Sequence, residues 1–359
     1  EGSVKVNYNG KVSTSWATRL PQAQTQFGHG AYSQAGALTS DTYSSWGPAL
    51  ANNAEVYDNI NTFFQNGVIA DNNVSVSGGN KIASFFLSLS NYDQTGIIRE
   101  TGYDKTTVRF NGDIHYGRLT VGANMSYSIS QTDKTLTSGG LYGGGGSGSM
   151  NSLFTFPNDI DMSKYLNEDG TKYRPFGSVF ELAEDKENPY WIINQNKLQD
   201  KTHRFTGALN ASFKIFDWWD ISARVGYDNY TTDAYTYIAP GGCVSLKYQN
   251  GRLSKNDYRY EYLSTNVMTN FHKTFGDFDL GLMVGTTTES TNRNNQTHWG
   301  YNFITAGTVS FSNIADNTQW FKDANSKKRL VGVYGEFRAS WKNAIFLTVT
   351  GRNDWTSTL

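Results

Sequence analysis

Seven aromatic side chains in the polar, glycine- and asparagine-rich segments are the residues whose chemistry best suits ligand binding. Binding sites favour aromatic rings beside a few polar groups, and a flat ring can stack on a sugar or grip a peptide side chain. The favoured interpretation is nevertheless that these rings only pack the connecting segments together. The seven residues are Trp46, Tyr142, Phe154, Phe156, Tyr190, Trp191 and Trp299.

Other reactive side chains have no spacing that indicates catalysis. The carboxylates of Asp159, Asp161, Glu168 and Asp169 suit calcium, a hard cation, but they do not match an EF-hand loop, and a solvated acidic loop is the favoured interpretation. The glycine tract at 143–146 lacks the Gly-Lys-Ser/Thr of a phosphate-binding loop. The five histidines have no metal-ligand spacing, and no Gly-x-Ser-x-Gly element is present. We therefore predict that the protein is not an enzyme, with no metal and no cofactor.

Composition and charge exclude several classes of protein. Among 359 residues, 38% are apolar, 14% are aromatic and 36 are glycines. Low hydrophobicity with many aromatics is typical of strands that are oily on one face only. No run of about 18 apolar residues is present, which excludes a transmembrane helix. The 31 basic and 32 acidic residues give no excess of positive charge of the kind that nucleic-acid-binding proteins have. The single cysteine, Cys243, excludes an internal disulfide framework.

The segment from Arg109 to Gln131 has the alternation of a membrane-spanning β-hairpin. Apolar and polar residues alternate on both sides of a short turn at Gly117. Each arm has about the 9 to 11 residues that a tilted strand needs to cross a bilayer. One face is therefore oily and the other faces a lumen. The lumen-facing residues include Arg109, Asp113, Asn124 and Ser126.

The same alternation recurs along the chain and predicts about eleven spanning strands. The fold class is thus all-β: a transmembrane, antiparallel, up-and-down β-barrel. Aromatic residues lie beside the short turns, as in an interfacial girdle. Because bacterial single-chain barrels have even strand numbers, the odd count predicts that the barrel is incomplete here. The long extracellular loops are expected at about 17–72, 132–201, 229–258 and 289–327.

Six short sequence motifs occur along the chain in the same order, and at about the same spacing, as in one known protein family. They are Leu20-Pro21 with Phe27-Gly28-His29-Gly30, Ser45-Trp46-Gly47-Pro48, Asn73 to Gly79 as NVSVSGG, Asp93-Gln94-Thr95-Gly96-Ile97, Asn188-Pro189-Tyr190-Trp191, and Gly351 to Leu359 as GRNDWTSTL. Each motif alone has little specificity. The ordered set, however, resembles the SusC/RagA-type TonB-dependent transporters of the Bacteroidetes outer membrane.

This resemblance implies a barrel of about 22 strands, the size class of plugged transporters, of which residues 1–359 are the N-terminal half. The plug and the TonB box would precede Glu1, and the C-terminal strands would follow Leu359. The implied function is uptake of oligosaccharides or oligopeptides across the outer membrane of a Gram-negative bacterium. The implied partners are a SusD-like surface lipoprotein, outer-membrane lipid and the TonB-ExbB-ExbD complex. The lumen-facing residues would then contact the plug.

Three alternatives remain open on the sequence. A passive porin-type channel would have neither a plug nor a TonB box. A soluble carbohydrate-binding β protein would leave membranes on treatment with salt or carbonate and fold without detergent. In the third alternative, this half is a separate chain in a two-piece barrel, and a partner polypeptide continues the strand pattern.

Overall fold

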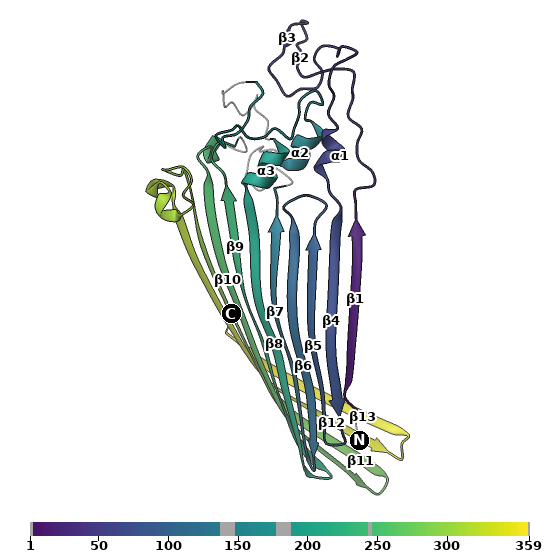
Figure 1. Cartoon of the computed structure of the whole chain (residues 1–359). Coiled ribbons are helices and arrows are strands. Elements are labelled where there is room, and N and C mark those ends of the chain that lie inside the picture. The colour runs from purple at the N-terminus through teal and green to yellow at the C-terminus, as the bar shows by residue number, and fades with distance from the viewer. Residues whose placement is uncertain (1–2, 137–147, 177–187, 243–245, 358–359) are drawn as a thin grey trace.

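One antiparallel sheet of 11 strands dominates the computed structural model, which describes residues 3–136, 148–176, 188–242 and 246–357 (Figure 1). The sheet confirms the predicted strand number and the all-β class. Its strands are β1 (Lys5–Ser15), β4 (Gly67–Gly79), β5 (Ala83–Thr95), β6 (Gly102–Tyr116), β7 (Leu119–Lys134), β8 (Lys197–Phe216), β9 (Trp219–Ile238), β10 (Arg252–Phe275), β11 (Phe278–Tyr301), β12 (Trp320–Trp341) and β13 (Ile345–Thr356).

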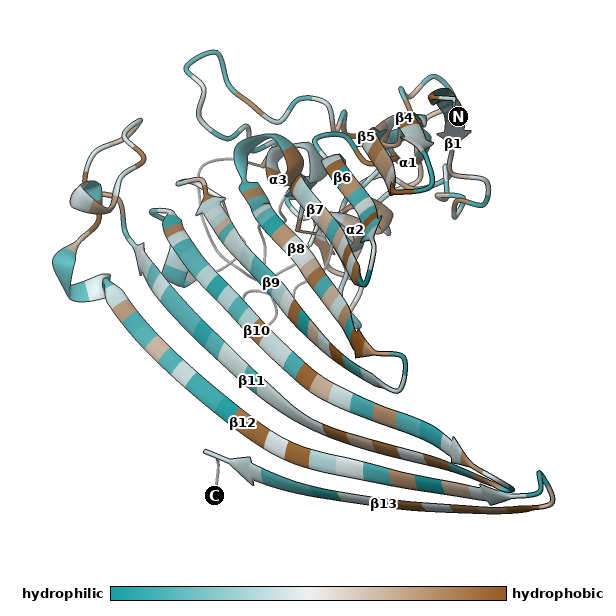
Figure 2. Cartoon of the chain, turned by 90° about the horizontal axis from the view of Figure 1, so that it is seen from below, coloured by the Kyte–Doolittle hydropathy of each residue, from teal (hydrophilic) through white to brown (hydrophobic). Residues whose placement is uncertain are grey.

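The strands follow one another in sequence order, each paired with the next, from β1 at one edge to β13 at the other. The sheet curves into an open arc, and β1 and β13 are not paired with each other (Figure 2). Short turns lie at one end of the sheet, here called the turn end, and the longer connections lie at the opposite loop end (Figure 1). The arrangement is that of a barrel wall that does not close within the described residues.

Both buried apolar clusters in the described part of the chain lie at the loop end. There the segments 16–66, 148–176 and 188–196, here called the cap, contain α1 (Asn59–Phe63), α2 (Ser149–Phe154), α3 (Pro189–Gln195) and the small hairpin β2 (Ala31–Tyr32) and β3 (Leu38–Thr39) (Figure 1). Among the described residues, no helix combines the length and the apolar character needed to cross a membrane. The main buried cluster of the cap comprises Tyr43, Ile60, Phe63, Leu153, Phe156, Met162 and Ile193.

The two faces of the sheet differ in polarity. Apolar side chains of β8 to β12 lie on one face, each between 40% and 48% exposed. Figure 2 shows that the hydrophobic positions of β10 to β12 are concentrated toward the turn end. Burial of apolar surface is favourable by about 25 cal/mol per Å², so a face of this extent is stable in lipid and not in water. The residues are Leu209, Val225, Leu263, Val267, Leu282, Val284 and Phe337.

The turn end carries the predicted girdle of aromatic residues. Phe216 and Trp218 stack with ring centroids 5.5 Å apart, and Trp219 and Phe271 stack at 5.5 Å. Lys273 Nζ lies 5.9 Å from the centre of the Trp218 ring. Amphipathic rings and cations are stable at the boundary between hydrocarbon and headgroups, so this edge of the sheet fits a membrane interface.

The bounds of all four predicted long loops differ from those in the structure. The predicted loops at 17–72, 132–201, 229–258 and 289–327 are shorter in the structure, where the connections are 16–66, 135–196, 239–251 and 302–319. Strands β10 and β11 each have 24 residues, more than twice the roughly 10 that span a bilayer. Beyond the oily band both faces are polar, so the alternation disappears from the sequence although the backbone pairing continues.

Charge on the apolar face is expected to prevent assembly. Leu209→Lys in the full-length protein places an ammonium in lipid, at a cost of about 2 to 4 kcal/mol near the midplane. Asn210→Lys, one residue along β8 on the polar face, is the matched control. Folded barrels resist unfolding in cold detergent, so the heat-modifiable band on gels should be lost for the first variant only. Equal assembly of both variants would contradict the assignment of the faces.

Candidate functional site

The polar face of the sheet brings together most of the residues predicted to face the lumen. Arg109 on β6 is directly opposite Ser126 on β7, and Asp113 is opposite Gly122. Arg109, Asn124 and Ser126 line one open hollow of about 510 Å³ with residues of β8, β9 and β10. Asp113 lies on the same face, closer to the turn end and outside the lining of this hollow. The hollow therefore gathers three of the four predicted residues.

An ion pair and a tyrosine stack continue this face toward the loop end. Arg204 on β8 donates two hydrogen bonds to the Asp228 carboxylate on β9, at 2.9 and 2.8 Å. The Arg204 guanidinium lies 5.5 Å from the centre of the Tyr230 ring, and Tyr230 stacks on Tyr260 of β10 at 5.0 Å. This cluster was not predictable from the sequence, because it depends on a cross-strand register that alternation alone does not determine.

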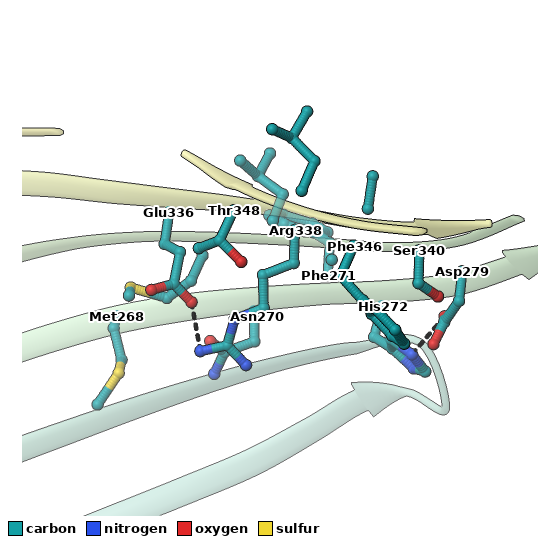
Figure 3. Close-up of a pocket in the computed structure, with 15 residues that line it drawn as sticks. Met268, Asn270, Phe271, His272, Asp279, Glu336, Arg338, Ser340, Phe346 and Thr348 are labelled. Carbon is teal, nitrogen blue, oxygen red and sulfur yellow. Dashed lines mark ion pairs between the residues drawn. The ribbon is translucent and has the colours of Figure 1, made fainter. Parts of the chain in front are cut away.

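A second hollow lies on the same face at the turn end of β10 to β13 (Figure 3). His272 Nε2 is 2.7 Å from Asp279 Oδ1, and Arg338 forms an ion pair with Glu336 on the same strand. Phe346, 70% exposed, lies beside these polar groups. The Asp279 and Glu336 carboxylates of this part of the wall thus each lie beside a nitrogen of a neighbouring side chain, as expected for a polar lining.

Three of the predicted loop aromatics pack inside the cap. Phe156 is 6% exposed and Trp191 is 3% exposed. Tyr190 is half-buried, and its hydroxyl donates to the carbonyl of Thr62 at 3.0 Å. A buried ring cannot stack on a ligand, so the structure favours the packing interpretation for Phe156 and Trp191. The Tyr190 ring stacks on Tyr165 at 6.2 Å and meets Phe63 edge-on at 5.5 Å, contacts that also serve packing.

The remaining predicted aromatics have different surroundings. Trp46, 64% exposed, and Phe154, 43% exposed, present rings at the surface of the cap. Tyr142 lies outside the described residues. The prediction that Trp299 lies in a loop is wrong: it belongs to β11, opposite Ser254 of β10 and Trp320 of β12. The prediction failed because the loop-end part of β11 is polar on both faces, so its sequence lacks the alternation of apolar and polar residues that indicates a strand.

One acidic residue of the predicted acidic loop holds the cap together. Asp159 accepts hydrogen bonds from the backbone N–H of His29 at 3.0 Å and lies 2.8 Å from its Nδ1. The His29 ring also contacts Phe176, with ring centroids 5.0 Å apart. A Cβ at Gly28 would lie 2.5 Å from Asp159 Oδ2, so only glycine permits this approach. The contact joins the first long connection to the second.

The other carboxylates of this loop satisfy local turns. Asp161 accepts from the Ser163 amide and hydroxyl, and Asp169 accepts from the Thr171 amide and hydroxyl. The hydrogen bonds from Thr171 lower the pKa of Asp169 below its ordinary value. Across the described residues, no group of three or more His, Cys, Asp or Glu side chains is arranged to hold a metal ion.

The antiparallel meander, its lipid-suited face and its polar face define the wall of a transmembrane β-barrel. No model of a protein family matches the chain. TonB-dependent receptor P3 of Formosa agariphila is 22% identical over 336 residues, covering 89% of this chain and 32% of that receptor. TonB-dependent receptor P26 of the same organism is 23% identical over 304 residues, covering 79% of this chain and 28% of that receptor. The chain thus spans less than a third of these curated relatives.

Solved structures show the same fold. The RagAB peptide importer in its closed-closed state superimposes with a TM-score of 0.66 at 17% identity, covering 84% of this chain and 33% of that chain. Another structure of the RagAB peptide transporter gives 0.65 at 16% identity. These matches confirm the resemblance to SusC/RagA-type TonB-dependent transporters. P3, P26 and RagAB are receptors or transporters by name, in agreement with the prediction that the chain is not an enzyme.

The contact between His29 and Asp159 is expected to control the order of the cap. Asp159→Ala in the full-length protein removes the acceptor of the His29 hydrogen bonds, and a bond to a charged group contributes about 1.5 to 3 kcal/mol. Limited proteolysis of intact cells should then cleave the connection 16–66 faster. Asp161→Ala, which loses only a local turn contact, is the control. Equal cleavage of both variants would show that Asp159 does not hold the cap.

Proposed function

We propose that the chain forms part of the wall of a TonB-dependent importer in the outer membrane of a Gram-negative bacterium. The observation that carries the proposal is the two-faced meander of 11 strands, with short turns at one end and a capped loop end at the other. Outer-membrane barrels have tight periplasmic turns and longer extracellular loops. The sequence similarity to TonB-dependent receptors supports active import over passive diffusion.

We further propose that residues 1–359 are the N-terminal half of a barrel of about 22 strands, a size that encloses a plug. The partial coverage of the relatives supports this assignment. In lipid, unpaired backbone groups cost several kcal/mol each, so β1 and β13 need further strands as neighbours. The plug and the TonB box would be supplied outside these residues and would connect the importer to TonB-ExbB-ExbD.

The proposed partner at the loop end is a SusD-like surface lipoprotein that closes over the cap. The similarity to RagAB, described as a peptide importer, supports a two-component assembly. The proposed cargo is an oligosaccharide or oligopeptide. The exposed rings of Trp46 and Phe154 supply flat surfaces at this end, where captured cargo would arrive.

Measuring whether uptake requires the proton gradient and TonB tests this proposal. Cells that carry the gene should accumulate the labelled cargo that supports their growth, and cells without it should not. A protonophore, or deletion of the TonB-encoding gene, should stop accumulation because the importer draws on the inner-membrane proton gradient. Uptake that continued after both treatments would identify a passive porin. Release of the full-length protein from membranes by carbonate would instead identify a soluble carbohydrate-binding protein.

Removal of the plug from the full-length protein tests the role of the lumen-facing residues. Arg109, Asp113, Asn124 and Ser126 are proposed to contact the plug, so the emptied barrel should leave an open, polar lumen. Cells that express it should become sensitive to large antibiotics such as vancomycin, which intact outer membranes exclude. Four single alanine variants with the plug retained serve as controls for expression. A barrel that stayed sealed after plug removal would contradict the assignment.

A further inference from the structure

The loop end of the polar face carries a cluster of cations and aromatic rings that the proposed function does not use. Lys247 Nζ lies 5.4 Å from the ring centre of Trp299 and 4.9 Å from that of Tyr301. Arg252 Cζ lies 5.1 Å from the ring centre of Tyr248 and 5.5 Å from that of Trp299. Two cations and three rings from β10, β11 and the connection before β10 therefore meet at one place.

The register of the sheet places this cluster on the lumen side. Arg252 is opposite Tyr301, and Trp299 is opposite Trp320. Pairing between β10, β11 and β12 runs without a shift from these residues to the turn end. Side chains alternate strictly along a strand, so the cluster shares the face of Asn270 and Arg338, which line the hollow of Figure 3.

The cations of the cluster have no acidic partner in the part of the chain that the structure describes. Neither Lys247 nor Arg252 makes an ion pair or a side-chain hydrogen bond there, and Arg252 Nε is shielded from solvent without an acceptor. Lys322, two residues beyond Trp320 on the same face, adds a third exposed cation. Buried donors without acceptors are costly, and like charges repel, so an anionic ligand would stabilise the cluster.

Flat apolar surface accompanies the charge. Trp320 is 44% exposed and its ring centroid is 5.8 Å from that of Trp299, at an interplanar angle of 44°. Sugar rings present flat faces of C–H groups that stack on indole rings. An extended peptide is usually bound by free main-chain groups at a sheet edge, but β10 and β11 are paired on both sides at this level. The available surface therefore consists of rings and cations.

The geometry points to a binding site for an acidic oligosaccharide at Lys247, Arg252, Trp299 and Trp320. The cations pair with carboxylate or sulfate groups along the oligomer, and Trp320 stacks on one of its sugar rings. Lys322 extends the positive charge along β12 toward the lumen, so an oligomer with a charge on successive units contacts more than one cation. This inference rests on the proposed importer function, since it assigns the class of cargo that the loop end captures.

Binding of defined oligomers to the purified full-length protein tests the inference. Isothermal titration in detergent should detect tetragalacturonate, with much weaker binding of the neutral cellotetraose and of a tetraglutamate peptide. Affinity for tetragalacturonate should fall as salt rises, because ion pairs at accessible sites are screened. Binding by tetraglutamate alone would replace the assignment by an acidic peptide. Equal binding of cellotetraose would show that the cations do not select the ligand.

Paired variants locate the site. Lys247→Gln and Trp320→Ala should each weaken tetragalacturonate binding by roughly tenfold or more, the equivalent of one charge-assisted contact. Lys255→Gln and Phe321→Ala, exposed residues on the opposite face of β10 and β12, should leave the affinity unchanged. If Lys247→Gln and Trp320→Ala both bound tetragalacturonate with wild-type affinity, the assignment of the binding site would be overturned. Because binding needs no proton gradient, uptake that proved passive would overturn the importer function and leave this result standing.

Discussion

A sheet in lipid must satisfy each backbone N–H and C=O through its neighbouring strands, and the rest of this structure depends on that constraint. From β1 to β13 the pairing is continuous, with one irregularity, between Lys214 and Phe216 next to a turn. Since a shift of one residue would move every side chain to the opposite face, continuous pairing keeps apolar and polar side chains on opposite faces throughout the apolar band.

This separation also explains where the protein can bury a core. One face of the sheet suits lipid and the other suits the lumen, so within the described chain the sheet shares a buried cluster with a helix only at the loop end, where Leu198 and Ile238 cluster with Ile192 of α3. The main buried apolar cluster is found in the cap. Rings such as Tyr43 and Phe156 pack in this cluster, and the contact of Asp159 with His29 joins the separate segments of the cap.

The faces of the strands could be predicted from the alternation of apolar and polar residues. Features that depend on contacts between residues distant in the sequence could not. The polar face at Arg109, Asp113, Asn124 and Ser126 was predictable because side chains along a strand have a period of two. The loop-end limits of β8 to β12 were not, because polar residues on both faces remove that signal. Neither the pair Arg204 and Asp228 nor the pair His29 and Asp159, which are 130 residues apart, has a local sequence signature.

The exposed fractions of Trp191 and Trp320 show which of the loop-end aromatic side chains can bind a ligand. Both lie at the loop end, but Trp191 is 3% exposed on α3 of the cap and Trp320 is 44% exposed on the sheet. Binding sites on strands are held more rigidly than sites on loops. Strands that continue past the bilayer therefore extend rigid, lumen-facing positions to the mouth of the barrel. This extension gives Trp299 and Trp320 their fixed spacing beside Lys247 and Arg252.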